Sequence, residues 1–585
     1  MRMAGLAGGL AVMMSAGLAH AQVAPTPAAA AGDIVVRSQR DRLSNWRQAE
    51  SQHVIVLSDG REGEVTAIAH NLERLFFLLS VLLNRVEKVD DTVKLRVTLI
   101  GDVAEFQSMN LRNLRWQQGP YNAVFDIRRY YDPREDGAVL ATTRIDQRVV
   151  LQRGQSVADV LQGIQLSNVQ PDPGAPPGSS TGAGVGGQAG LFGLQSNADL
   201  IRPVNEESVP LTAEGMIYAG FAQHYLTTFF PAAYPRWYLD GFGQLFSTLV
   251  VRGDTVMEYG RAPVGTTAVL HRFGNFNLAD VLSGAYLEQS ADKTRWTPVH
   301  AWMLTHFLFF SPTRSGQLRS YLQAVANGRS SAEAAVVFGD PDVLAKELRA
   351  YFYAKKPFER MTYPATRTDT PLVRRLSLGD AAFVKGRLEL GSRIEGATAS
   401  PAQRDAWLKR LRSDAAKFPA DGRAQVLLAE AECRSDHGAA CVAAADRALA
   451  LAPNDSAALT WSGVATTQQA LALTGETRTA MLRKARATIA RANRADTEAP
   501  GPLIAYYRSF VAAGETAPAI AVDGLAKALT LVPNASATRL TLGTELASRG
   551  NAPVARGTLM PVARGGYDSP ERAKAVAVLD SLPAR

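Results

Sequence analysis

The chain has 585 residues, of which 46% are hydrophobic, 20% charged and 8% aromatic. This composition is typical of globular proteins, and the length is too great for one hydrophobic core, so we expect about two or three domains. The 63 Lys and Arg residues exceed the 55 Asp and Glu residues by eight. They are not gathered into the basic runs of a dedicated nucleic-acid binder, so we expect no nucleic-acid partner.

Residues 1–21 have the layout of a secretory signal peptide. Arg2 supplies one positive charge, an apolar stretch follows to Leu18, and Ala19-His20-Ala21 forms an A-x-A cleavage site. The sequence thus predicts an exported protein, periplasmic or secreted and soluble after cleavage, that begins with a flexible spacer over residues 22–43. The longest later apolar run, Leu75–Leu83, is about half a bilayer span. It predicts a buried core helix and no transmembrane segment.

Strand and helix patterns alternate in the first half of the chain. Runs rich in β-branched residues predict strands, and apolar residues at helical spacing predict helices. A stretch over residues 171–203 is rich in Gly and Pro and predicts a disordered loop inside one domain. The expected elements are strands over 53–58, 93–100 and 148–152, a helix over 62–86, and mainly helices over 211–352. Together they predict an α+β domain whose second half is mostly helical.

An internal repeat follows after Pro357, where Ala becomes frequent. Ala429, Cys441, Ala448 and Pro453 recur eighty residues later as Ser509, Ala521, Ala528 and Pro533. Small residues at such intervals let paired helices approach, and Pro closes the second helix of a pair. The spacing resembles the tetratricopeptide repeat, although that family's aromatic positions are largely absent. We expect a linker with the first helices over 357–420, and an all-α array over 421–585 with about four helix pairs, the second one lengthened.

The two cysteines, Cys433 and Cys441, flank a predicted turn at Asp436-His437-Gly438. An antiparallel helix pair would place them face to face, and an oxidising compartment then favours a disulfide. Two thiols kept for packing are the alternative. A metal pair would find only His437 nearby.

The sequence over 216–226, followed by Tyr234-Pro235-Arg236-Trp237 and residues up to 246, resembles the peptidase-MA-like gluzincins. These zinc peptidases carry His-Glu-x-x-His on one helix and the third ligand in a Tyr-Pro-x-Trp-x-x-Glu-Gly context on the next. The resemblance runs from Trp46 to the helices around 302–308 and 338–340. It implies a gluzincin-like domain over residues 44–356.

The residues that would hold zinc are missing from this framework. Carried over by position, the first His is Ala219, the general base is Gly220, the second His is Gln223 and the third ligand is Asp240. Zinc needs two His four residues apart on one helix face and a further carboxylate, and the Glu takes a proton from the metal-bound water. We therefore predict that the zinc site is lost, that no metal or other cofactor binds, and that the domain is a pseudoenzyme.

Other interpretations of the same residues stay open at this stage. A peptidase could use a non-standard ligand set of His224, Asp240 and Glu214. Against this, the sequence favours His224 as a hydrogen-bonded core or rim residue over a metal ligand. Asp240 could cap a helix that begins near Gly241, and Gly220 could mark close helix packing or the floor of a groove.

A basic face is expected on the helix over residues 477–493 and just beyond it. Its members fall within one arc of the helical wheel: Arg483, Lys484, Arg486, Arg491 and Arg494. They could meet an acidic partner, or they could form an ordinary solvated face.

The sequence as a whole predicts an exported, non-catalytic protein whose repeats bind a protein or peptide as a scaffold, because helical arrays present extended concave surfaces. A third possibility is that the first domain is only a structural platform for the repeats.

Overall fold

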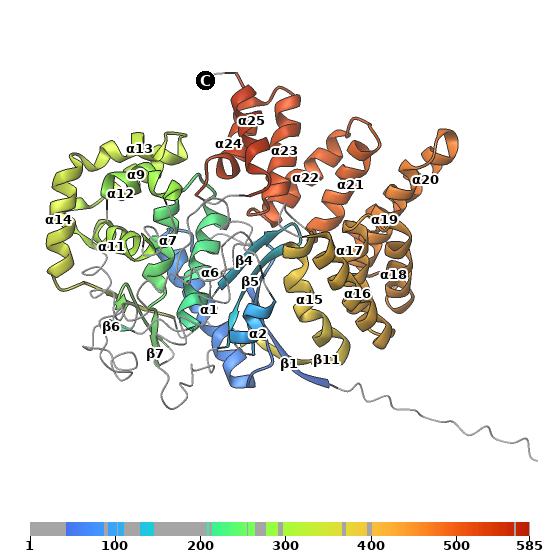
Figure 1. The fold of residues 1–585 in the computed structure, drawn as a ribbon, viewed down its shortest axis with the longest axis horizontal. Helices are drawn as coiled ribbons and strands as arrows, with labels where there is room; N and C mark the ends of the chain where they lie inside the picture. Colours follow the sequence, from blue (N-terminus) through green and yellow to red (C-terminus); the bar gives the residue numbers. More distant parts are fainter. Residues whose placement is uncertain are drawn as a thin grey trace, which may run out of the picture. The chain divides into compact units, whose positions relative to one another are not determined.

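The computed structural model describes residues 43–86, 92–101, 103–109, 111, 129–144, 208–209, 213–253, 255–263, 277–289, 297–364, 370–394, 400–566 and 569–583 (Figure 1). The predicted signal peptide, nearly all of the spacer, the strand at 148–152 and the Gly/Pro loop at 171–203 lie outside the described residues. Export therefore stays a prediction.

A mixed six-stranded sheet forms the centre of the first domain. Its strand order is β11-β1-β2-β3-β5-β4, with β2 parallel to β3 and β3 parallel to β5, while the other pairs are antiparallel. The strands are β1 (Leu43–Glu50), β2 (Val54–Ser58), β3 (Leu95–Ile100), β4 (Arg129–Arg134), β5 (Gly137–Thr143) and β11 (Leu372–Ser377). The strands predicted near 53–58 and 93–100 are confirmed.

Both faces of this sheet are covered by helices. Along β5, Ala138 and Leu140 belong to one core with α1 (Glu62–Leu82) and α6 (Ala213–Phe229). The alternate residues Val139 and Ala141 belong to a second core with α2 (Val103–Ser108) and α15 (Leu378–Ile394). This alternation is what a strand with two buried faces requires. Helix α1 is long and apolar enough to cross a membrane, yet much of it is buried in the first core, as the predicted core helix should be.

The second half of this domain is mainly helical, as predicted, with short strands added. Trp237 and Trp302 are fully buried at its centre. The helices are α7 (Arg236–Phe246), α9 (Leu278–Ser283), α11 (Thr297–Phe310), α12 (Gln317–Ala326), α13 (Ser331–Ala334) and α14 (Pro341–Tyr353), with 3₁₀ turns η2 (Ala285–Glu288), η3 (Pro312–Arg314) and η4 (Ala335–Phe338). The short strands are β6 (Ser208–Val209), β7 (Val250–Arg252), β8 (Val256–Tyr259), β9 (Ala262–Pro263) and β10 (Glu359–Thr362).

The domain boundary expected at residue 356 is too early. Strand β10 pairs with β8, and β11 pairs with β1 at the edge of the main sheet. Residues 357–420, predicted as a linker with the first helices, thus supply two strands to the first domain before α15 begins. Helix α15 belongs to both parts, because it covers the sheet and also packs against the helices that follow.

The helical array contains the four helix pairs that the sequence predicts, and they lie between Gly422 and Ala563. The first helices of successive pairs also touch: α17 packs on α19, and α19 on α21. The array helices are α16 (Pro401–Lys417), α17 (Gly422–Arg434), α18 (Gly438–Leu451), α19 (Ser456–Leu471), α20 (Gly475–Ala495), α21 (Pro500–Ala512), α22 (Ala519–Leu531), α23 (Ser536–Ser548), α24 (Ala552–Ala563) and α25 (Arg572–Ser581). The second pair, α19 with α20, has the longest helices, as expected.

The eighty-residue repeat relates the first pair to the third. Ala429 on α17 and Ser509 on α21 are both buried, as are Ala448 on α18 and Ala528 on α22. One repeat of that length therefore spans two helix pairs. The predicted disulfide is also confirmed: Cys433 lies in the last turn of α17, Cys441 lies in the first turn of α18, and their Cα atoms are 5.1 Å apart.

Candidate functional site

Helices α6 and α7 carry the four positions where a gluzincin would hold zinc and its general base. Ala219 is fully buried, and Gly220 faces the sheet. A Cβ added at Gly220 would lie 2.7 Å from Leu140 Cδ1 and 3.0 Å from Arg129 Cδ. This position has no room for a glutamate side chain, so the close-packing interpretation of Gly220 is correct.

Gln223 occupies the second His position, and both ends of its side-chain amide form hydrogen bonds inside the protein. Its Oε1 accepts a hydrogen bond from Arg129 Nη2 at 2.8 Å, and its Nε2 donates to the carbonyl of Leu239 on α7 at 2.7 Å. The side chain is 7% exposed. It ties β4, α6 and α7 together, which is a structural role.

Asp240 occupies the third ligand position and forms a buried ion pair. Arg236 Nε lies 3.0 and 2.9 Å from the two carboxylate oxygens of Asp240, one turn earlier on the same helix. The idea that Asp240 caps a helix beginning near Gly241 is wrong, because α7 begins at Arg236 and places Asp240 in its middle. Because Arg236 already pairs with both carboxylate oxygens of Asp240, this carboxylate is not available to a metal ion.

His224 lies in a hydrogen-bonded cluster that joins the two parts of the chain. Its Nδ1 is 2.9 Å from the Tyr131 hydroxyl and 3.2 Å from Nδ2 of Asn534, in the segment between α22 and α23. Asn534 also donates to Thr228 Oγ1 at 2.6 Å. The interpretation of His224 as a hydrogen-bonded residue is the one that its contacts support.

The three residues of the alternative site each have separate partners. Glu214 accepts hydrogen bonds from Tyr218 and, at 3.0 Å, from Asn71, whereas Asp240 is paired with Arg236. Within the described ranges, no group of three or more His, Cys, Asp or Glu side chains could hold a metal ion. The side chains at the four carried-over positions do not fit zinc.

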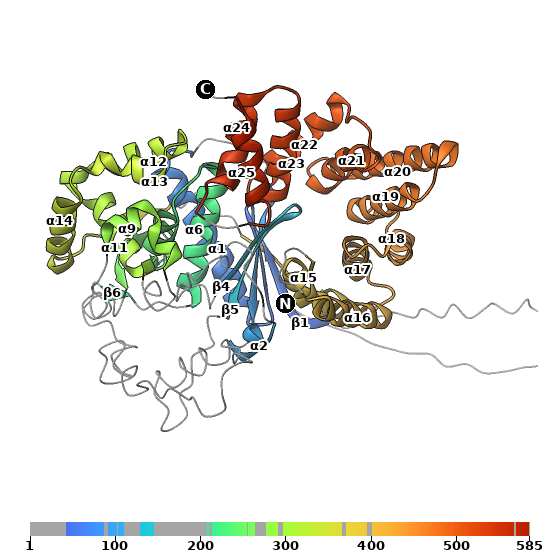
Figure 2. The same ribbon diagram turned by 45° about the horizontal axis from the view of Figure 1, so that its top comes forward.

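The hairpin of β4 and β5 is a second polar site, and the sequence did not lead us to it. It runs from the sheet toward α22 and α23, with α15 beside it (Figure 2). An Asp-Gly dipeptide at Asp136-Gly137, between two β-rich runs, is the signal that could have revealed this turn. Gly137 has φ of +117°, which residues with a side chain rarely adopt.

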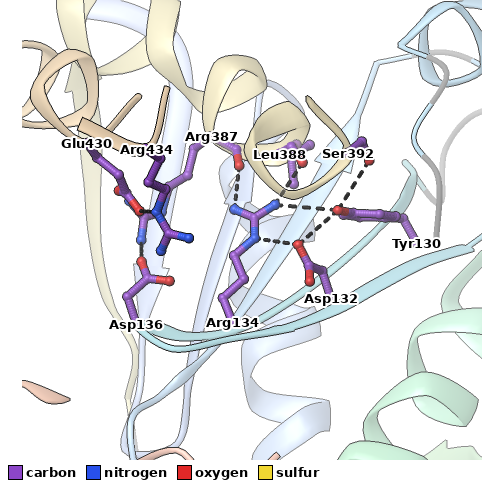
Figure 3. Close-up of polar contacts among 9 residues, drawn as sticks. All are labelled: Tyr130, Asp132, Arg134, Asp136, Arg387, Leu388, Ser392, Glu430 and Arg434. Atoms are coloured by element: carbon purple, nitrogen blue, oxygen red, sulfur yellow. Dashed lines mark hydrogen bonds and ion pairs between the residues drawn. The ribbon is translucent and has the colours of Figure 1, made fainter. Parts of the chain in front are cut away.

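The base of this hairpin is fixed to α15 by buried polar groups, which we call the hairpin anchor: Tyr130, Asp132 and Arg134 (Figure 3). Arg134 donates to the carbonyls of Arg387 at 2.5 Å and Leu388 at 2.8 Å, and its Nε lies 2.5 Å from Asp132. Burial, together with the charge of Asp132, raises the pKa of Tyr130 above its ordinary value. The anchor fixes the start of the array on the sheet.

The array is attached to the first domain at its far end as well. Besides the Asn534 contacts, the carbonyl of Leu531 accepts a hydrogen bond from the backbone amide of Val93 at 2.9 Å. A Cβ added at Gly566 would lie 2.5 Å from the backbone nitrogen of Arg236, so the segment after α24 lies directly against α7. The first domain therefore contacts the array at α15 and again around α22 to α24.

The predicted basic face on α20 is partly engaged inside the array. Arg486 forms an ion pair with Glu515 at 2.9 Å and lies over the ring of Phe510. Arg491 bonds to the carbonyl of Pro453 and, at 3.1 Å, to Asn454. The remaining members of the set are exposed: Arg483, Lys484 and Arg494.

No family model and no curated protein matches the chain. Among solved structures, a thermophilic TPR protein of Thermus thermophilus is similar, with 16% identity, coverage of 34% of this chain and 98% of that one, and a TM-score of 0.30. A likeness at this TM-score adds nothing to the helix pairs described above. The resemblance to gluzincins stays a prediction.

Proposed function

We propose that this chain is an exported, non-catalytic binding protein, in which a domain of gluzincin-like layout carries a helical array that binds a protein or peptide. The observation that carries the proposal is the stack of four consecutive helix pairs in which α17, α19 and α21 pack side by side. Such a stack has an inner surface formed by the first helix of each pair, and surfaces of this kind suit extended ligands.

The non-catalytic part of the proposal is supported by how the polar groups between α6 and α7 are used. Gln223 bridges Arg129 and Leu239, and Asp240 is paired with Arg236. A hydrolase would need such groups to be available to water and substrate. Here they are buried and bonded to one another, as the polar groups of a stable core are.

The test uses the purified chain from residue 22 onward and a library of displayed peptides. We expect selection to enrich a common peptide motif, and hydrogen exchange with an enriched peptide to protect α17, α19, α21 and α23 more than α18, α20, α22 and α24. Protection confined to the second helices would contradict binding on the inner surface.

Catalysis is tested on the same preparation. We expect no hydrolysis of peptide substrates and, after dialysis against trace zinc, less than about a tenth of an equivalent of bound metal. Hydrolysis that disappears in His224→Ala would instead establish an enzyme. A full equivalent of zinc that survives dialysis would show that the metal ligands lie elsewhere in the chain.

A further inference from the structure

The tip of the β4–β5 hairpin, which consists of Glu135 and Asp136, is bound by the array in the way that an acidic ligand would be. Glu135 makes a two-pronged contact with Arg508 on α21: Nη1 lies 2.7 Å from Oε2 and Nη2 lies 2.8 Å from Oε1. Thr538 on α23 donates to the same carboxylate at 2.9 Å. Two first helices of successive pairs thus hold one carboxylate. Bidentate arginine contacts of this kind are geometrically specific for carboxylates.

Asp136 is held on the other side by arginines of the earlier helices (Figure 3). Its Oδ2 is paired with Nη2 of Arg387 on α15, and Arg434 on α17 adds to the positive field. Burial alone would raise the pKa of Asp136, but Arg387, and after it Arg96, lower this pKa to about 2. The array therefore supplies positive charge to both tip carboxylates.

The tip differs from the hairpin anchor in its contact with water. Arg134 and Asp132 of the anchor have side chains that are 1% and 4% exposed. At the tip, the side chains of Arg508 and Glu135 are 47% and 13% exposed, and those of Arg387 and Asp136 are 24% and 29% exposed. Ion pairs that water reaches contribute little net stability, because the separated charges are well solvated. Because water reaches the tip pairs in part, the tip can leave its arginines at a lower cost than the anchor would incur.

We propose that the hairpin tip is an internal ligand of the array, and that the array's external ligand is an acidic peptide segment that competes with Glu135 and Asp136 for Arg508 and Arg387. The inference rests on the proposed binding function and adds the chemistry of the partner. Arg434 and Arg508 come from α17 and α21, two of the first helices that form the inner surface, and Arg387 comes from α15, which packs against α17. A tethered ligand competes at an effective concentration of millimolar order, which lowers the apparent affinity for any free acidic segment.

The experiment compares the full chain with the double variant Glu135→Gln/Asp136→Asn, which keeps the shape of the tip and removes its charge. The probe is a fluorescent cyclic peptide of residues 131–140, closed because an isolated two-stranded hairpin is marginally stable. We expect the double variant to bind this peptide at least about tenfold more tightly than the parent chain. A neutral version of the peptide, with Gln and Asn at the two tip positions, should bind neither protein.

Two further variants complete the test. Adding Arg508→Ala and Arg387→Ala to the double variant should abolish the gain, and the charge-preserving swap Glu135→Asp/Asp136→Glu should keep the low affinity of the parent. Circular dichroism and melting curves identify any variant that has unfolded. If the double variant has unfolded, the swap variant can still be compared with the parent chain, because both have two charged residues at the tip.

The proposal is overturned by equal affinity of the acidic peptide for the parent and the double variant, or by a gain that survives loss of both arginines. These results are separate from the outcome of the library selection. If the selection enriches peptides that are not acidic and that bind both proteins equally, the array binds peptides and the competition by the tip is refuted. If neither protein binds any peptide, the proposed function falls with it.

Discussion

Two polar regions of this chain have similar residues and opposite surroundings. Between α6 and α7, Gln223, Asp240 and Arg236 are at most 7% exposed and are bonded to one another or to backbone carbonyls. At the hairpin tip, the carboxylates of Glu135 and Asp136 meet arginines that water reaches. Buried pairs resist exchange because breaking them leaves an uncompensated charge, whereas exposed pairs can trade partners. The polar groups of the region that resembles an active site are thus bonded within the core, and the region that we propose for binding is the one whose contacts the sequence patterns do not reveal.

The largest effect expected from this comparison is the loss of the buried pair on α7. Asp240→Ala leaves Arg236 buried without its carboxylate, which should lower the free energy of unfolding by about 3 to 5 kcal/mol. Urea denaturation measures the change. A matched control is Asp414→Ala on α16, which removes a pair of similar spacing whose Lys417 side chain is 62% exposed. That variant should lose less than about 1 kcal/mol. Equal losses at the two sites would show that burial does not set how much these ion pairs contribute to stability.

A second prediction restores the residue that a gluzincin has as its base. Gly220→Glu forces a side chain against Leu140 and Arg129, and overpacking a filled core costs about 3 kcal/mol at the upper end of its range. Chemical denaturation of the variant should show this loss. Gly557→Glu on α24 is the control, because a Cβ at Gly557 meets nothing within 4 Å. Because Glu is a better helix former than Gly, this substitution should raise the free energy of unfolding slightly, by less than about 1 kcal/mol.

There is a physical reason why the sequence predicts some of these features and not others. The four helix pairs could be predicted because small residues and terminal prolines act locally, within one pair. Gly220 could be interpreted because packing on a helix also follows local spacing. Asp136-Gly137 is a local signal for the hairpin turn, but the contacts of the tip could not be predicted. Its partners Arg387 and Arg508 lie 251 and 373 residues away, and contacts at such separation leave no periodic pattern.

Strands β10 and β11 escaped prediction for a related reason. Both are edge strands of four and six residues that join sheets built mostly from segments more than a hundred residues earlier. Edge strands need only one partner and carry weak alternation, so composition after Pro357 predicts a linker in their place. The disulfide and the lengthened second pair needed no such distant information, and both predictions are confirmed.

A third prediction uses His306, another polar group buried in the first domain. Its Nε2 lies 2.7 Å from the Gly260 carbonyl and its Nδ1 lies 2.7 Å from the Tyr351 hydroxyl, so the neutral ring donates to one and accepts from the other. Burial lowers the pKa of His306 to about 4. The unfolded chain takes up this proton near the ordinary value of 6.5, so the stability from the neutral ring is complete above pH 6.5. It is lost as the pH falls from there toward 4.

The size of this effect follows from the two pKa values. Between pH 7 and pH 5 the stabilising contribution of His306 should fall by about 2 kcal/mol. Other groups titrate in the same window, so the quantity to measure is the difference in unfolding free energy between the parent chain and His306→Gln at both pH values. A difference that stays constant would show that His306 titrates alike in the folded and unfolded chains.

The smallest effect belongs to the hairpin tip. Glu135→Gln keeps the shape of the side chain and removes one charge from a pair whose Arg508 side chain is half exposed. Its cost in unfolding free energy should stay below about 1 kcal/mol, and it should shrink further at 1 M salt, where the Debye length is about 3 Å. The comparison variant is Arg134→Ala at the anchor of the same hairpin, where loss of a buried partner of Asp132 should cost several times more. If Glu135→Gln destabilises the chain as much as Arg134→Ala, the tip is part of the fixed core and cannot serve as an exchangeable ligand.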